Sequence, residues 1–107
     1  MNKEAAIQAL IKTLPLNECG WIPVDHWEAD LCAIGIARSD RSRQLVYVST
    51  YGKLPGRYDY QCEMPAGPHD DDYVTTASGE DVDTETLLAV IKDHLAVTPD
   101  EVSGKAV

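Results

Sequence analysis

The stretch QLVYVSTYGKLPGRYDYQCEM, from Gln44 to Met64, decides the fold that we predict for this chain. Its first part, 45–51, is rich in β-branched and aromatic residues on both faces, which is typical of a central β-strand. Its second part alternates, and predicts a strand with one buried and one solvent-exposed face. The buried face carries Tyr58, Tyr60, Cys62 and Met64, and the exposed face carries Arg57, Asp59, Gln61 and Glu63. Gly52, Pro55 and Gly56 lie between the two parts and predict a tight turn, which makes the stretch a β-hairpin.

Strands are also expected on both sides of the hairpin. Residues 30–38, DLCAIGIAR, form an almost continuous apolar run that predicts a buried strand. Its small residues Ala33, Gly35 and Ala37 share one face, where we expect a bulky group, such as a helix, to pack closely. Residues 16–28 are expected to form a loop with a short strand at 21–24, and residues 73–77 a short edge strand.

Helices are predicted at both ends of this strand region. Apolar residues recur at helical spacing from Ala6 to Leu14, with Asn2 available as an N-cap and Pro15 ending the run. In the second helix Asp83 is expected at the N-cap. The other signals for this helix are Glu85 in its first turn, Val82 and Leu87 as a hydrophobic staple, and an inner stripe of Leu87, Leu88, Ile91, His94 and Leu95.

The predicted fold class is therefore α+β. It has an N-terminal helix, an antiparallel meander of three or four strands and a C-terminal helix, with both helices packed on one face of the sheet. At 107 residues and 44% hydrophobic composition, the chain is long enough for one core. We expect a single domain over 1–98 and a flexible C-terminal tail over 99–107.

The charge of the chain is unevenly distributed and indicates the kind of partner. The formal net charge is -9, and residues 58–107 carry twelve Asp/Glu but only two Lys/Arg. Such a field repels nucleic acids and anionic lipids and attracts basic proteins. We therefore expect a small non-enzymatic binding protein that engages a basic protein partner through its acidic C-terminal half. The residues predicted to bind this partner are Asp70, Asp71, Asp72, Glu80, Asp81, Asp83 and Glu85.

Two other functions stay open at this point. One is a small metal-dependent or cysteine hydrolase that uses Cys62, His69 and Asp70 to Asp72. Acidic neighbours would raise the pKa of the Cys62 thiol, and consecutive carboxylates diverge, so we assign no catalytic residue, metal ligand or cofactor. The other is a homodimeric structural domain whose strand edge or exposed face pairs with a second copy.

Nucleic-acid binding is not expected, because the basic residues fall at opposite ends of the predicted meander. These residues are Arg38, Arg41, Arg43, Lys53 and Arg57. Trp21 and Trp27 are either anchors of the core or residues of a binding surface.

General features of the chain indicate its cellular compartment and the class of proteins that it resembles. The spacing of Cys19, Cys32 and Cys62 contains no CxxC motif, and no apolar run is long enough to span a membrane. We expect a bacterial-type cytoplasmic protein with reduced thiols. The order of elements and the acidic charge resemble small binding proteins such as secretion chaperones and the immunity proteins that neutralise basic toxins. This resemblance implies binding to a protein and assigns no residue.

Overall fold

The computed structural model describes residues 3–69 and 71–96 of the chain. The elements in this part are α1 (Ala5–Thr13), α2 (Leu16–Cys19), β1 (Trp21–Val24), β2 (Ala33–Arg38), β3 (Arg41–Ser49), β4 (Arg57–Pro65), β5 (Tyr73–Asp83) and α3 (Thr84–Ala96). The tail predicted over 99–107 lies outside the described residues, as does Asp70.

The strands form one antiparallel sheet in the order β1-β2-β3-β4-β5, which confirms the predicted meander. The predicted number of three or four strands is wrong, because the described sheet has five. β1 pairs with β2 although it contains Pro23, since an edge strand tolerates a residue that cannot donate a hydrogen bond on its outer side. β5 continues to Asp83, well beyond the predicted end at Ala77, and two irregularities in its register with β4 accommodate the extra length.

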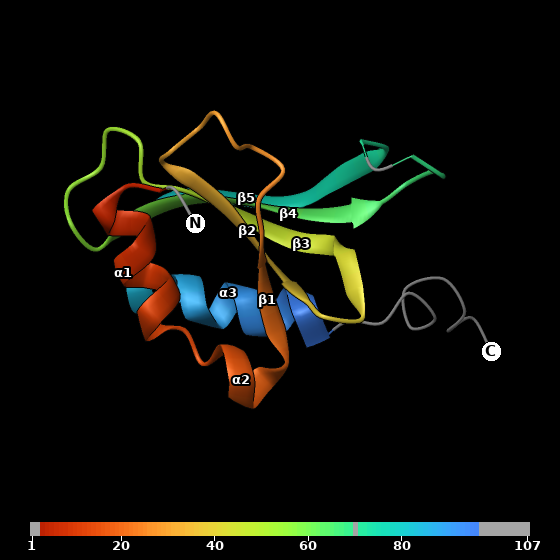
Figure 1. Ribbon diagram of the computed structural model, residues 1–107, viewed down its shortest axis with the longest axis horizontal. Coiled ribbons are helices and arrows are strands. Elements are labelled where there is room, and N and C mark those ends of the chain that lie inside the picture. The colour runs from red at the N-terminus through yellow and green to blue at the C-terminus, as the bar shows by residue number, and fades with distance from the viewer. Residues whose placement is uncertain (1–2, 70, 97–107) are drawn as a thin grey trace.

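The helices lie together on one face of the sheet, as predicted (Figure 1). Ile7 and Leu10 of α1 and Leu87, Ile91 and Leu95 of α3 are buried against the strands. The strands and the adjoining segments contribute Leu14, Trp21, Ile34, Ile36, Val46, Val48, Tyr58 and Cys62 to this main core. Of the four residues predicted on the buried side of β4, Tyr58 and Cys62 are buried in this core, Tyr60 packs against it while partly exposed, and Met64 is half-buried outside it. Because Trp21 belongs to the main core, it is an anchor of the fold.

The opposite face of the sheet, which we call the outer face, carries Leu45, Tyr47 and Ser49 of β3 opposite Glu63, Gln61 and Asp59 of β4. The loop between β1 and β2, residues 25–32, folds over part of this face (Figure 1). Trp27 of this loop lies against Gly35, where an added Cβ would be 3.2 Å from the indole ring and 3.1 Å from the carbonyl oxygen of Val24. A bulky group does pack on the small residues of β2, but it is an indole ring and not a helix.

Local signals were accurate at the turn and less so at the first helix. The loop between β3 and β4 has positive φ at Gly52 (69°) and Gly56 (80°), which confirms why glycine is needed there. α1 begins at Ala5, so the prediction of Asn2 as its N-cap is wrong, and Glu4 occupies that position without capping. Residues 16–19, predicted as loop, form the short helix α2. None of the described helices is long and apolar enough to cross a membrane.

Candidate functional site

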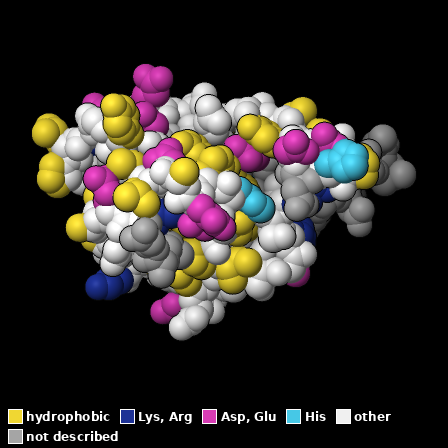
Figure 2. Space-filling view, turned by 45° about the horizontal axis from the view of Figure 1, so that its top comes forward, with side chains coloured by type: hydrophobic (Ala, Val, Ile, Leu, Met, Phe, Trp, Pro, Cys, Tyr) yellow, Lys and Arg dark blue, Asp and Glu magenta, His cyan; other side chains and the backbone are white. Residues whose placement is uncertain are grey.

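The acidic residues predicted to bind a partner are distributed over different parts of the structure. Asp71 and Glu80 are exposed and line two separate pockets on the outer face. Glu85 is exposed in the first turn of α3, on the helical side of the sheet. Figure 2 turns the upper side of the molecule forward and shows carboxylate side chains spread among hydrophobic ones.

Asp72 has a structural role in the loop that joins β4 to β5. Its carboxylate accepts a hydrogen bond from the backbone N–H of His69 at 3.1 Å, and its carbonyl oxygen accepts one from Ala66 at 2.8 Å. Arg43 of β3 donates from its guanidinium to the carbonyl oxygens of His69 and Asp72. The loop is thereby held against the start of β3, and Asp72 is occupied within it.

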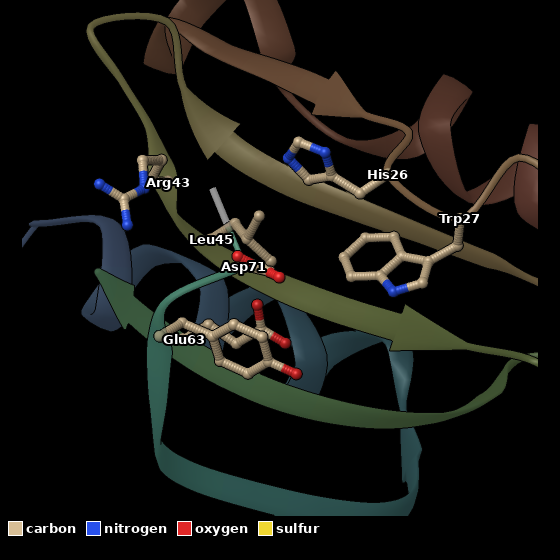
Figure 3. Close-up of a pocket in the computed structure, with 7 residues that line it drawn as sticks. His26, Trp27, Arg43, Leu45, Glu63 and Asp71 are labelled. Carbon is tan, nitrogen blue, oxygen red and sulfur yellow. The ribbon is translucent and has the colours of Figure 1, made fainter. Parts of the chain in front are cut away.

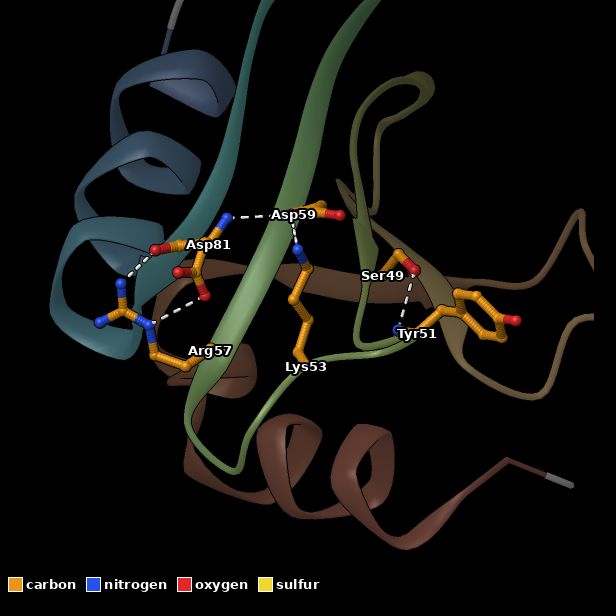
Figure 4. Close-up of polar contacts among 6 residues, drawn as sticks. All are labelled: Ser49, Tyr51, Lys53, Arg57, Asp59 and Asp81. Carbon is orange, nitrogen blue, oxygen red and sulfur yellow. Dashed lines mark hydrogen bonds and ion pairs between the residues drawn. The ribbon is translucent and has the colours of Figure 1, made fainter.

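Asp81 is held in an unusual backbone conformation near the far end of β5. Its φ is 55°, in the left-handed region that few non-glycine residues adopt. Asp59 accepts a hydrogen bond from its N–H at 2.9 Å, and Arg57 binds both its carbonyl oxygen and its carboxylate (Figure 4). Lys53 forms an ion pair with Asp59 at 3.0 Å. Although partial burial alone would raise the pKa of Asp59, the hydrogen bonds from Asp81 and Lys53 hold it below its usual value.

Asp83 caps α3, as the sequence predicted. Its Oδ1 accepts a hydrogen bond from the N–H of Thr86 at 2.8 Å, and this bond lowers the pKa of the carboxyl group. Val82 and Leu87 both pack in the main core, as expected for a hydrophobic staple. Asp72, Asp81 and Asp83 therefore stabilise the fold through their own contacts, which leaves Asp71 and Glu80 as the predicted residues that face the open sheet surface.

The larger hollow on the outer face, which we call the Glu63 pocket, has a volume of about 400 Å³. It lies between the loop 25–32 and the loop 66–72 that follows β4. Its lining comprises His26, Trp27, Arg43, Leu45, Glu63, Asp71 and Tyr73. In Figure 3 the carboxylates of Glu63 and Asp71 point into the space that the rings of His26 and Trp27 face from the other side. This pocket therefore presents acidic and aromatic groups to one volume.

Glu63 corrects the prediction that the polar face of β4 is solvated. Its side chain is on the outer face, as the alternation predicted, but only 5% of the residue is exposed. Burial raises the pKa of its carboxyl group above the usual 4.5, although the charge of a protonated His26 acts in the opposite direction. No hydrogen bond or ion pair of this carboxylate is found within residues 3–69 and 71–96.

A network around Lys3 fixes the loop that carries Trp27. The ammonium group of Lys3 lies 2.8 Å from Oδ1 of Asp25 and donates to the carbonyl oxygens of Trp27 (3.0 Å) and Asp30 (2.7 Å). On the sheet side, the indole of Trp27 makes an edge contact with the ring of Tyr47, with centroids 4.8 Å apart. Trp27 is thus held from both sides, and it forms a wall of the Glu63 pocket.

A second, smaller hollow of about 250 Å³ lies farther along the outer face. Its lining comprises Tyr47, Ser49, Asp59, Tyr60, Gln61, Ser78, Gly79 and Glu80. Burial raises the pKa of Tyr47, and the nearby carboxylates of Asp30, Asp59 and Glu63 raise it further.

The structure does not bring Cys62 together with His69 and the described aspartates Asp71 and Asp72. Cys62 is buried in the main core on the helical side of the sheet, and burial raises the pKa of its thiol to about 11. His69 is exposed in the loop after β4. His94 is engaged in α3, where its Nε2 lies 2.9 Å from the carbonyl oxygen of Glu63. In the part of the chain that the structure describes, no three His, Cys, Asp or Glu side chains gather closely enough to hold a metal ion.

Most of the basic residues named above bind groups of the protein itself. Arg38 pairs with Asp40, Lys53 with Asp59 and Arg57 with Asp81, and the guanidinium of Arg43 binds backbone carbonyl groups. These contacts spread the cations over separate loops and strand ends.

Comparison with known protein families, with curated proteins and with solved structures finds no match to this chain. The candidate site therefore stands on its geometry. Sequence reasoning missed Glu63 and Tyr73 as site residues and left Trp27 between two roles. The available signal was the period-2 alternation, which placed Glu63 on the polar face of its strand, and the structure pairs it there with Leu45. The sequence does not show which loops fold over this face.

Proposed function

We propose that this chain is a non-enzymatic binding protein that engages a basic segment of a protein partner with the outer face of its sheet. The observation that carries the proposal is the composition of this face, which none of the described helices covers. It combines the aromatic residues Trp27, Tyr47 and Tyr73 with the acidic residues Asp59, Glu63, Asp71 and Glu80. An inhibitor, an immunity-like protein and a chaperone-like protein would each use such a surface.

Aromatic and acidic groups support binding in different ways. Aromatic side chains supply a large contact area and lose little conformational entropy on binding, and they are common among the residues that dominate binding energy. Carboxylates attract a basic partner over several ångströms and accelerate its approach. Asp71 and Glu80 are exposed on the outer face, and the described residues offer neither of them an ion pair. They are therefore the acidic residues best suited to meet a partner.

Charge reversal on the outer face tests the proposal. The variant Asp71→Lys/Glu80→Lys and the control Glu18→Lys/Asp93→Lys change the net charge equally, but the control places both lysines on helices of the other layer. The wild type and the control should capture the same basic protein from a lysate of native cells and release it in about 0.5 M salt, where charges are screened within about 4 Å. The outer-face variant should capture little. Equal capture by both variants would count against the outer face as the binding surface.

A homodimer is a second candidate, which the length of β5 favours. β5 is an edge strand of 11 residues, and Tyr73 and Val74 at its start are exposed large hydrophobic residues. An exposed edge can pair with the same edge of a second copy. Sedimentation velocity should then give a dimer that Val74→Lys converts to a monomer. A monomer at all concentrations up to about 100 μM, where even weak pairs are populated, would exclude this candidate.

A further inference from the structure

Glu63 is the one buried carboxylate on the outer face that lacks a partner among the described residues. It is 95% buried, and its carboxylate points into the Glu63 pocket (Figure 3). The carboxylate reaches solvent only through this pocket, and proteins normally supply a poorly solvated carboxylate without an ion pair or hydrogen bonds with a donor. A ligand could supply the hydrogen-bond donor that the described residues do not offer to the Glu63 carboxylate.

The cations of the chain nearest to this pocket are directed elsewhere. Arg43 lines the pocket and donates from Nη2 to the carbonyl oxygens of His69 and Asp72, while its buried Nε has no hydrogen-bond partner among the described residues. Lys3 binds Asp25 and the carbonyl groups of the loop 25–32. His26 is exposed at the rim, so it can screen Glu63 only while it is protonated.

The walls of the pocket suit a flat cation. Trp27 is fixed by its contacts with Tyr47 and Gly35, and Tyr73, which is 47% exposed, lines the same space. Aromatic rings attract cations through the negative potential of their faces, and a guanidinium group also stacks on them because it is planar. Its several N–H donors can bind two carboxylates together, and both Glu63 and Asp71 line the pocket. An ammonium group offers charge without this planarity.

We propose that the Glu63 pocket receives the guanidinium group of a single arginine side chain of the basic protein partner. This inference rests on the proposed function, since it names the residue of the partner that the outer face recognises. Glu63 binds the guanidinium from the floor of the pocket, Asp71 binds it at the mouth, and Trp27 and Tyr73 pack on the side chain. The volume of about 400 Å³ leaves room for the guanidinium group and the aliphatic chain that carries it.

A titration with short peptides followed by NMR tests the pocket directly. The probe is acetyl-Gly-Gly-Arg-Gly-Gly-amide, and the matched peptides contain lysine or the neutral isostere citrulline in place of arginine. The titration is carried out at pH 7.5. We expect the arginine peptide to shift the Trp27 indole N–H resonance and the amide resonances of Leu45 and Glu63. The lysine peptide should bind more weakly, and the citrulline peptide should cause no shift.

Variants of the protein complete the test. Glu63→Gln preserves the shape of the side chain and should weaken binding of the arginine peptide at least tenfold, because a charge-assisted bond is lost. Tyr73→Leu, at an exposed position, should weaken it about threefold. Asp93→Asn, on the exposed side of α3, is the control and should bind like the wild type.

Three results would overturn the inference: absence of shifts at the pocket, equal binding by Glu63→Gln, or tighter binding of free L-arginine than of the peptide. The last result would assign the pocket to a small molecule. The capture experiment of the preceding section separates the two proposals. If Asp71→Lys/Glu80→Lys abolishes capture while Glu63→Gln leaves capture and peptide binding unchanged, the outer face still binds the partner and only the arginine pocket is excluded.

Discussion

Replacing Lys3 with methionine tests whether one buried ammonium group positions the wall of the Glu63 pocket. The side chain of Lys3 is fully buried, and its ammonium group contacts Asp25 and the carbonyl oxygens of Trp27 and Asp30 at 2.7–3.0 Å. Methionine has a similar length but carries neither the charge nor the donors. The substitution therefore removes all three contacts and leaves the packing volume nearly unchanged.

The expected loss follows from the kind of contacts that are removed. A hydrogen bond to a charged group contributes about 1.5–3 kcal/mol, and breaking a buried ion pair costs about 3–5 kcal/mol. The side chain of Asp25 is 28% exposed, so water solvates part of the carboxylate that Lys3→Met leaves behind. Burial of the methionine side chain offsets a further part. We expect the free energy of unfolding to fall by about 3 kcal/mol, which a domain with the usual stability of about 5–15 kcal/mol survives.

Urea denaturation and amide hydrogen exchange measure this effect. The control is Lys12→Met in the last turn of α1, where the lysine is exposed. In Lys3→Met, exchange should accelerate most across the loop 25–32, because the lost contacts hold that loop. In a double-mutant cycle, Lys3→Met and Asp25→Asn together should cost less than the sum of the single changes. The reasoning is refuted if Lys3→Met stays within about 0.5 kcal/mol of the Lys12→Met control, the range of an ordinary surface substitution.

Three further predictions concern single titratable groups. Asp83→Ala removes the cap of α3 and should lower the urea midpoint more than Glu85→Ala. The folded state lowers the pKa of Asp83 below its usual 3.8, so this difference between the two variants should shrink as the pH falls below 3.8. Urea denaturation at pH 7 and at pH 3 measures the change. Glu63→Gln should be more stable than the wild type at pH 7. The folded state raises the pKa of Glu63, so the stability that this side chain contributes is present below pH 4.5 and is lost as the pH rises. If the difference in urea midpoint between the two proteins is the same at pH 4 and at pH 7, the prediction is wrong. Glu4→Ala should accelerate alkylation of Cys32 by iodoacetamide at pH 8 by roughly tenfold or more. The hydrogen bond to Glu4 is the main reason that the pKa of this thiol is about 11 and not 9.0. Mass spectrometry of the labelled protein gives the rate, and an unchanged rate would refute the assignment.

Local patterns in the sequence predicted those parts of the fold that local physics determines. The spacing of apolar residues located both long helices, and a cap signal located the start of α3 at Asp83. Positive φ at Gly52 and Gly56 follows from the steric freedom of glycine, so the hairpin was predictable from composition. Such signals depend on neighbours in the sequence and need no knowledge of the rest of the chain.

The remaining features depend on contacts between distant segments. The polar residues at 78–81 favour a turn, yet β5 continues through them. A side chain at Gly79 would overlap the ring of Tyr60, and Asp81 keeps its left-handed conformation through Arg57 and Asp59 of β4. Whether a strand continues through such residues depends on its contacts with the neighbouring strand. No local sequence pattern shows these contacts.

The same limit explains why the site was only partly predicted. Alternation assigned Glu63 to the outer face, but solvation of that face depends on the loops that fold over it. The loop 25–32 covers part of the face because Trp27 finds space against Gly35 and because Lys3 binds the loop from the other side. The negative charge of the second half of the chain was evident from composition. Its division into carboxylates that stabilise the fold and carboxylates that remain available required the hydrogen bonds.

Lys3 and Glu63 are two buried charged residues on either side of the loop 25–32, and they differ in whether the fold supplies them with partners. Lys3 has an anion and two carbonyl groups within hydrogen-bonding distance, so its burial is compensated by the fold itself. Glu63 is buried to the same degree, but its carboxylate has no ion pair or hydrogen bond among the described residues, and only the charge of a protonated His26 favours its ionised form. If this carboxylate binds the arginine of the partner that we propose, Glu63→Gln should raise the stability of the free protein and weaken binding of the arginine peptide; a change in neither property would contradict the proposal.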